Sequence, residues 1–347
     1  MKVITCASFY GTGSSAITDL LTEYEHVKSH GEYELSFVHE FDGISDLEYH
    51  LTECHNRNNS SVALKRFEKK SKFNAGKFFN KRYEPFFQNQ YLSTTREYLE
   101  ELIEFKVKGH AFFEQFDKGL VYYYFQSLLT KIMHLAHVHM NTMPNEYLYY
   151  SHPSKEKFLE LTQNYTHALL KLANKDNSEF LIIDQLLPSS NISRCLRYFK
   201  DDVKVIVVDR DPRDIYVSCR FVWKDDRAPV DPYEFCQWYR YARESSKGQE
   251  VDPTKVLKIQ FEDLIYDYLN SVNKIENFIG IDNKWHSMKF KKLNPKRSFV
   301  NTQQWKKYNV CNEIEIIENQ LPEYIYNFSR FDGITIEGID NNNKKAF

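Results

Sequence analysis

The sequence lacks any long apolar run. No hydrophobic segment approaches the roughly 18 to 20 residues that a membrane-spanning helix needs, and the segment after Lys2 has no apolar core of a signal peptide. The six cysteines include no CxxC pair, a pattern that favours reduced thiols over a disulfide framework. Together these absences predict a protein without a transmembrane segment that works in the cytoplasm.

Neither sign of charge dominates the chain. It has 46 Lys and Arg against 48 Asp and Glu, for a net charge of −2. Basic patches are therefore local, which argues against nucleic acid as a main partner. With 347 residues, modest glycine and proline and 42% hydrophobic residues, we expect one or at most two globular domains.

The chain opens with a strand, a loop of small residues and an amphipathic helix. The strand is expected over Val3 to Ala7 and the loop over Gly11 to Ser15. The helix is indicated by apolar residues that share one face, namely Ala16, Ile17, Leu20, Leu21 and Tyr24. Glycines allow close backbone approach, and the hydroxyls of Thr12, Ser14 and Ser15 can donate to phosphate oxygens. This loop is therefore a candidate anion site.

Two common phosphate motifs can be compared with this loop. A Walker A loop ends in Gly-Lys-Ser/Thr, and the loop contains no lysine, so ATP or GTP hydrolysis is disfavoured. The dinucleotide pattern GxGxxA is satisfied by Gly11, Gly13 and Ala16, with Glu32 or Glu34 at a plausible distance for the ribose. An NAD-dependent oxidoreductase is therefore one alternative.

A second strand-to-helix turn carries an arginine. The β-branched run Val205 to Val208 predicts a buried strand that stops at Arg210, and Asp211-Pro212 then starts a helix. An arginine at the carboxyl end of a parallel strand, facing a helix N-terminus, is typical of anion binding in α/β proteins. The sequence therefore predicts two phosphate-binding turns.

The combination of the loop, the RDPRD motif with Ser218, and the segment KVLKIQFEDLIYDYLNSVNKIENFIGI resembles the sulfotransferases that use phosphoadenosine phosphosulfate (PAPS). The resemblance covers residues 1 to 40 and 178 to 310. It implies a PAPS donor, the product PAP and no metal ion. The implied donor-binding residues are Gly11, Thr12, Gly13, Ser14, Ser15 and Ala16 for the phosphosulfate, Arg210 and Ser218 for the 3′-phosphate, and Lys296 and Arg297 in a basic loop over the nucleotide.

Sulfuryl transfer also needs a base that takes the proton of the acceptor hydroxyl. The resemblance to carbohydrate-type members places this base after the first helix, where Glu34 fits best. Glu32, two residues away and so expected on the same strand face, is the second candidate. Asp184, at the end of a predicted strand over Phe180 to Ile183, is either another base candidate or a structural residue.

The sequence departs from the family pattern at one important position. The family's first loop usually carries Lys or Arg where this chain has Gly11, so one positive charge is missing. A non-catalytic nucleotide-binding module is therefore a further alternative. It would bind PAP without making a sulfated product.

A large segment, residues 42 to 175, separates the two blocks of resemblance. It is rich in aromatic residues and mostly helical in its periodicity, with long helices expected over Leu120 to Met140 and after an N-cap at Ser154. We expect a single α/β domain with a P-loop-like three-layer fold, a central parallel sheet and this helical insertion on the acceptor side. The expected acceptor is a saccharide or another molecule with a hydroxyl group.

Overall fold

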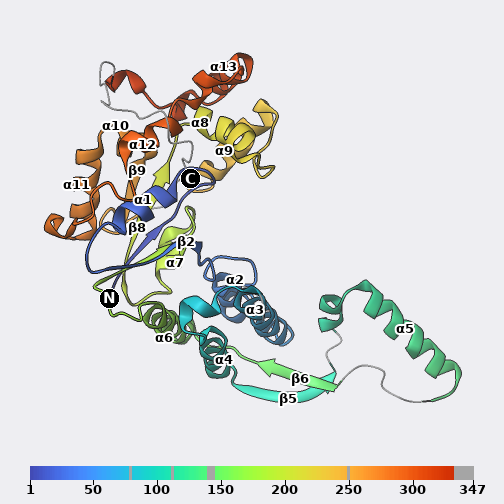
Figure 1. Ribbon diagram of the computed structural model, residues 1–347. Coiled ribbons are helices and arrows are strands. Elements are labelled where there is room, and N and C mark those ends of the chain that lie inside the picture. The colour runs from blue at the N-terminus through green and yellow to red at the C-terminus, as the bar shows by residue number, and fades with distance from the viewer. Residues whose placement is uncertain (78–79, 111–112, 139–144, 248–250, 332–347) are drawn as a thin grey trace. The chain divides into compact units, whose positions relative to one another are not determined.

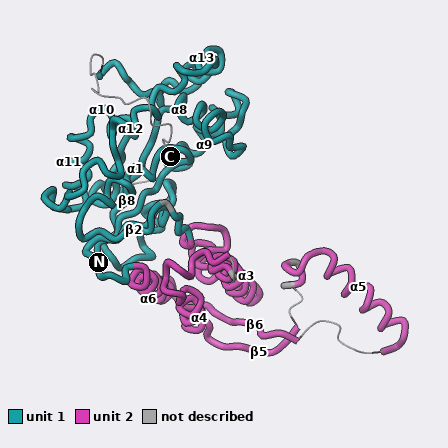
Figure 2. The backbone as a smooth tube through the Cα atoms, viewed as in Figure 1, with its two compact units in different colours: residues 1–36, 174–347 teal, residues 37–173 magenta. Residues whose placement is uncertain are grey.

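The computed structural model describes residues 1–77, 80–110, 113–138, 145–247 and 251–331 (Figure 1). Two compact units divide the chain. Unit 1 comprises residues 1–36 and 174–347, and unit 2 comprises residues 37–173 (Figure 2). Unit 2 therefore has nearly the same bounds in the sequence as the insertion expected over 42 to 175.

Unit 1 is built on a five-stranded sheet with the order β2-β7-β1-β8-β9, in which every neighbouring pair is parallel (Figure 1). The strands are β1 (Lys2–Cys6), β2 (Val27–Glu34), β7 (Phe180–Asp184), β8 (Asp202–Asp209) and β9 (Val256–Gln260). In the central strand, Ile4 stands opposite Ile182 of β7 and Lys204 of β8. The predicted α/β class with a central parallel sheet is confirmed.

Helices of unit 1 pack on the sheet through alternating strand residues. Ile4 and Cys6 of β1 and Ile206 and Val208 of β8 join one buried cluster with residues of α1 and α11. The helices are α1 (Ser14–Leu21), α7 (Ile192–Leu196), α8 (Pro212–Val217), α9 (Pro232–Glu244), α10 (Phe261–Tyr266), α11 (Tyr268–Ile279), α12 (Pro295–Ser298) and α13 (Cys311–Gln320). Shorter helical turns are Ser218–Trp223, Asn283–Trp285, Phe299–Asn301, Gln304–Lys307, Pro322–Tyr324 and Phe328–Phe331.

Unit 2 is mostly helical and has two small antiparallel ribbons. Its helices are α2 (Ile44–Glu48), α3 (Asn59–Ala75), α4 (Tyr91–Leu102), α5 (Leu120–Leu135) and α6 (Lys155–Ala173), with turns at Tyr49–Glu53, Glu84–Phe87 and Phe113–Lys118. The ribbons pair β3 (Gly76–Lys77) with β4 (Asn80–Lys81), and β5 (Phe105–His110) with β6 (Asn145–Tyr150). Within the described ranges, no helix is both long and apolar enough to cross a bilayer.

Several local predictions are confirmed. The strand over 205 to 208 lies inside β8, Asp211 caps α8 by accepting from the N–H of Arg213, and Ser154 caps α6 by accepting from the N–H of Lys157. The helix expected over 120 to 140 ends at Leu135, and residues 139–140 lie outside the described part of the chain.

One local prediction is wrong. In the segment KVLKIQFEDLIYDYLNSVNKIENFIGI, the helical spacing of Leu269, Val272, Ile275 and Ile279 predicts that these four residues share one apolar face. In α11 the other three are buried, but Leu269 is 74% exposed. Leu269 lies in the first turn of the helix, on the edge of the apolar stripe, where no element of the described chain covers it.

The N-cap of α9 gives a prediction about stability. The Asp231 carboxylate accepts from the N–H groups of Tyr233 and Glu234 at 2.9 and 3.0 Å. We expect Asp231→Ala to lower the free energy of unfolding by about 1 kcal/mol, because both donors lose their partner. Asp231→Asn keeps an acceptor oxygen, so it is expected to lower the free energy of unfolding by only a small fraction of the loss in Asp231→Ala. Equal losses in the two variants, measured by chemical denaturation, would contradict this role of the cap.

Candidate functional site

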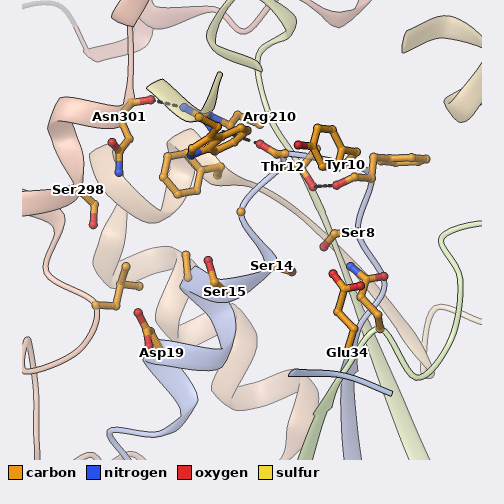
Figure 3. A pocket seen from close by; sticks show the side chains of 18 of the residues that line it. Ser8, Tyr10, Thr12, Ser14, Ser15, Asp19, Glu34, Arg210, Ser298 and Asn301 are labelled. Carbon is orange, nitrogen blue, oxygen red and sulfur yellow. Dashed lines mark hydrogen bonds between the residues drawn. The ribbon is translucent and has the colours of Figure 1, made fainter. Parts of the chain in front are cut away.

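A cavity of about 950 Å³ opens in unit 1 where the strands of the sheet end. Because the strands are parallel, the segments after β1, β7, β8 and β9 meet at one edge of the sheet, where open α/β folds bind ligands. The lining comes from residues 8–16 with Asp19, from Glu34 and Gln185, from Arg210, Trp223, Asp225 and Arg227, and from Phe261, Lys292, Leu293, Arg297, Ser298 and Asn301. Figure 3 shows Ser298 and Asn301 at one side of this cavity and Glu34 at the other.

The loop after β1 is shaped by two glycines. Gly11 and Gly13 have φ values of 75° and 94°, in the left-handed region that disfavours other residues. A Cβ at Gly13 would also lie 2.8 Å from the ring of Phe261. The loop closes on itself because Thr12 donates from its N–H and its hydroxyl to the Phe9 carbonyl. As a result, α1 begins at the cavity with Ser14, and its first turn contains no acidic residue.

Arg210 links this loop to two other segments. Its guanidinium is 3% exposed and donates to the Gly11 carbonyl at 3.2 Å, to the Ser218 hydroxyl at 3.2 Å and to the Asn301 carbonyl. Its Nε has no hydrogen-bond partner among the described residues. Arg210 lines the cavity, whereas Ser218 is buried behind it and contributes no lining. Of the pair predicted for the 3′-phosphate, only the arginine reaches the cavity directly.

Three buried carboxyl groups lie around the turn that carries Arg210. The Asp211 carboxylate accepts from Nε and Nη2 of Arg213. The Glu262 carboxyl group accepts from the N–H of Asp211. Asp214 accepts from the N–H groups of Gln303 and Gln304 at 2.9 and 2.7 Å. These contacts fix the segment that brings Asn301 to Arg210.

Burial raises the pKa of two of these carboxyl groups. The pKa of Glu262 lies well above its usual range because the residue is fully buried and close to Asp211. Burial raises the pKa of Asp214 to about 7, although the charge of Arg210 acts in the opposite direction. Near neutral pH, Asp214 is therefore partly protonated in the folded protein.

Two cations line the cavity on the side of Ser298. They are Lys292 and Arg297, whereas the neighbouring Lys296, predicted to bind the donor, is exposed and contributes no lining. The Asn294 side chain caps α12 by accepting from the N–H of Lys296, and Arg297 donates to the carbonyl of Lys292. The sequence did not single out Lys292, because it lies in a basic run with Lys289 and Lys291 and no motif separates them.

A buried carboxylate holds the segment that carries Lys292. Glu23, just after α1, accepts from the N–H groups of Lys292 at 2.6 Å and Leu293 at 3.0 Å. It also accepts from the N–H of Phe290 and lies 2.8 Å from Nε2 of His286. The position of the cation in the cavity is thus set by backbone contacts and not by its own side chain.

The structure describes the side chains of two of the three base candidates, Glu34 and Asp184. Glu34 is exposed at the end of β2 and lines the cavity. Asp184 is 3% exposed, does not line it, and accepts from the Ser14 hydroxyl at 3.3 Å and from the N–H of Gln185. The side chain of Glu32 lies outside the described part of the chain. The register between β2 and β7 shifts between Ser29 and Glu34.

The wall beside Glu34 contains residues that the sequence did not indicate. Tyr10 donates from its hydroxyl to Asp225 at 2.5 Å, and Nε of Arg227 donates to both oxygens of Asp225, at 3.0 and 2.8 Å. The Arg227 guanidinium lies 4.7 Å from the centre of the Tyr10 ring. The hydrogen bond to Asp225 is the main cause that raises the pKa of Arg227, and the charge of Glu34 adds to it. Arg227 is therefore a fixed cation at the Glu34 side.

Trp223, in the same wall of the cavity, lies next to Gly11, the position where the family's loop usually carries Lys or Arg. A Cβ at Gly11 would lie 3.1 Å from the ring of Trp223, so a lysine or arginine at this position would need that ring to shift by a few tenths of an ångström and would also hold a strained φ of 75°. The cations at the cavity come instead from Arg210, Arg227, Lys292 and Arg297. No group of His, Cys, Asp and Glu residues within the described ranges is arranged to hold a metal ion.

Comparison with known proteins identifies the family. A sequence profile described as the sulfotransferase family matches residues 114–287, half of the chain. The chain belongs to the sulfotransferase family. The protein is thus a sulfotransferase, as the sequence resemblance implied, and the dehydrogenase alternative is set aside. No curated protein sequence matches the chain.

Solved sulfotransferase structures are similar to this sulfotransferase over most of its length. The sulfotransferase domain of the Synechococcus PCC 7002 olefin synthase is 13% identical, with 92% of this chain and 94% of that one covered and a TM-score of 0.41. STF1 from Mycobacterium tuberculosis H37Rv is 11% identical, with 93% and 77% covered and a TM-score of 0.39. The family assignment rests on the sequence match.

The pKa of Asp214 gives a prediction about pH. A carboxyl group whose folded pKa lies above its unfolded value near 4 stabilises the fold fully at low pH, and this contribution is lost as the pH rises through about 7. We compare wild type with Asp214→Asn, which cannot titrate. The free energy of unfolding of wild type minus that of Asp214→Asn should fall from pH 4 to pH 7, by up to about 1.4 kcal/mol per pH unit. Above pH 7 the difference should stay level. A difference that stays constant across this range would contradict the raised pKa.

Proposed function

We propose that this sulfotransferase moves a sulfuryl group from PAPS to a hydroxyl group of a saccharide. One observation carries the proposal. A single cavity contains the N-terminus of α1 and the cations Lys292 and Arg297, and at its other side the exposed carboxylate of Glu34. An anionic donor and a hydroxyl that must lose its proton need these groups within one enclosure.

The lining of the cavity fits PAPS, which supplies the sulfuryl group and leaves as PAP. The cavity volume is within the range of small-molecule sites. The first N–H groups of α1 and the hydroxyls of Ser14 and Ser15 are suited to the phosphosulfate. Arg210 has a buried Nε without a partner and is suited to the 3′-phosphate, with Ser218 orienting its guanidinium. Lys292 and Arg297 would balance the remaining negative charge.

Glu34 is our proposed general base. Of the two candidates whose side chains the structure describes, Glu34 and Asp184, it is the one that lines the cavity, so it can accept the proton of an acceptor hydroxyl as the oxygen attacks sulfur. Asp184 is occupied by the Ser14 hydroxyl and by a backbone N–H, so we assign it a positioning role for the loop. Positive charge and N–H groups at the other side stabilise the negative charge that grows on the leaving oxygen.

The wall beside Glu34 supports a saccharide as the acceptor. Tyr10 and Trp223 place aromatic rings next to the charged pair of Asp225 and Arg227, a combination of flat apolar surface and polar groups that suits a sugar. All six cysteines are free thiols, which is in keeping with the cytoplasmic location that we propose. The contribution of unit 2 to acceptor choice stays a prediction.

Neighbouring lysines test the donor site. We expect Lys292→Ala to weaken PAP binding about tenfold, because a cation at the cavity is lost, whereas Lys296→Ala should leave the affinity within about twofold. Isothermal titration calorimetry with PAP measures both variants. The two lysines lie in one segment and carry the same charge, so Lys296→Ala is a matched control. Similar losses in both variants would overturn the assignment of the cavity as the donor site.

Glu34→Gln tests the base. The amide cannot take a proton but fills the same space, so we expect turnover to fall at least about a hundredfold while PAP affinity is unchanged. Sulfated product is measured with labelled PAPS and a panel of saccharides. A variant that keeps wild-type turnover would exclude Glu34 as the base. Wild-type protein that binds PAP but sulfates no hydroxyl compound would favour the non-catalytic binding module.

A further inference from the structure

Helix α5 of unit 2 exposes an apolar face. The helix, Leu120–Leu135, has no buried residue. Val121, Tyr124, Phe125, Leu128, Ile132 and Leu135 are between 50% and 86% exposed. At 100° per residue these six side chains fall within one stripe about 100° wide, the width of a face that normally packs on a partner.

The other side of α5 contacts its own chain. α5 contacts the turn Phe113–Lys118, and on this side of the helix the Lys118 ammonium lies 5.2 Å from the centre of the Tyr122 ring. Gln126 donates to the Tyr122 hydroxyl across one helical turn. The helix therefore has a partly covered side of mixed polarity, where Tyr122, Gln126, Leu129 and Met133 are half-buried, and the apolar stripe lies away from it.

The stripe is larger than a monomer normally exposes. Six large apolar side chains, each at least half exposed, follow one another along about 24 Å of helix. Soluble monomers rarely expose a contiguous apolar patch larger than a few hundred Å². A helix of 16 residues is also shorter than the roughly 20 that span a bilayer. Such a helix can lie in the interface of a membrane with its apolar face inserted.

The charge of this region favours an anionic surface. No Asp or Glu occurs between Asp117 and Glu146, and the helix carries Lys131 and His134. Lys131 lies beside the border of the apolar stripe and is exposed. Anionic lipid headgroups would attract the exposed Lys131, and no carboxylate on the helix would repel them.

We propose that α5 is an interfacial helix that binds an anionic lipid bilayer through Val121, Phe125, Leu128 and the rest of its apolar stripe. The attachment goes beyond the transferase activity and does not depend on the donor site. It would place the enzyme at a membrane surface, where the concentration of membrane-borne acceptors is high.

Co-sedimentation of the full chain with lipid vesicles tests the proposal. One set of vesicles is phosphatidylcholine, and the other contains phosphatidylglycerol as well. Leu128→Glu places a charge in the centre of the stripe, and Thr130→Glu adds the same charge on the opposite side of the helix. Both variants lose the same electrostatic attraction, so the ratio of their affinities isolates the insertion of apolar side chains.

We expect wild type to bind the phosphatidylglycerol vesicles more tightly than phosphatidylcholine alone. Leu128→Glu should bind them about tenfold more weakly than Thr130→Glu, with PAP affinity equal in all three proteins as a check of folding. No binding to either kind of vesicle, or equal affinities of the two variants, would overturn the proposal. So would a wild-type dimer that Leu128→Glu dissociates in the absence of vesicle binding, since the stripe would then face a second copy.

Discussion

The buried guanidinium of Arg210 joins the three segments on which the site depends. One group donates to Gly11 of the first loop, to Ser218 after α8, and to Asn301 near the end of the described chain. A buried positive charge is costly unless it is paired and hydrogen-bonded, so separating these acceptors would leave the buried guanidinium without its hydrogen bonds. The loop, the helix and the C-terminal segment are therefore coupled before any ligand binds.

Two carboxyl groups anchor the C-terminal segment by the same means. Glu23 accepts N–H groups around Lys292, and Asp214 accepts those of Gln303 and Gln304. A carboxyl group that accepts from successive backbone N–H groups fixes the main chain and leaves the side chains of that segment available for other contacts. Lys292, Arg297 and Asn301 can thus face the cavity although they belong to short turns and not to long helices.

The sequence predicted those parts of the site that depend on local chemistry. The glycine loop, the strand before Arg210 and the caps at Asp211 and Ser154 follow from periodicity and from side chains that bond nearby backbone. It did not predict Tyr10, Trp223, Asp225, Arg227 and Lys292, because their approach depends on contacts between residues far apart in the chain. The same limit applies to Ser218 and Lys296, which were predicted to bind the donor but do not line the cavity. A motif gives a residue's position along the chain, but burial decides whether its side chain meets the ligand.

The order of the strands has a consequence for synthesis on the ribosome. β1 precedes unit 2 in the sequence, whereas its neighbours β7 and β8 begin at residues 180 and 202, after the whole of unit 2. β1 therefore stays without its partner strands while the whole of unit 2 is translated. The cavity also needs Asn301, so its lining is complete only after this residue has been made. Chaperones that shield exposed strand edges are expected to matter during this interval.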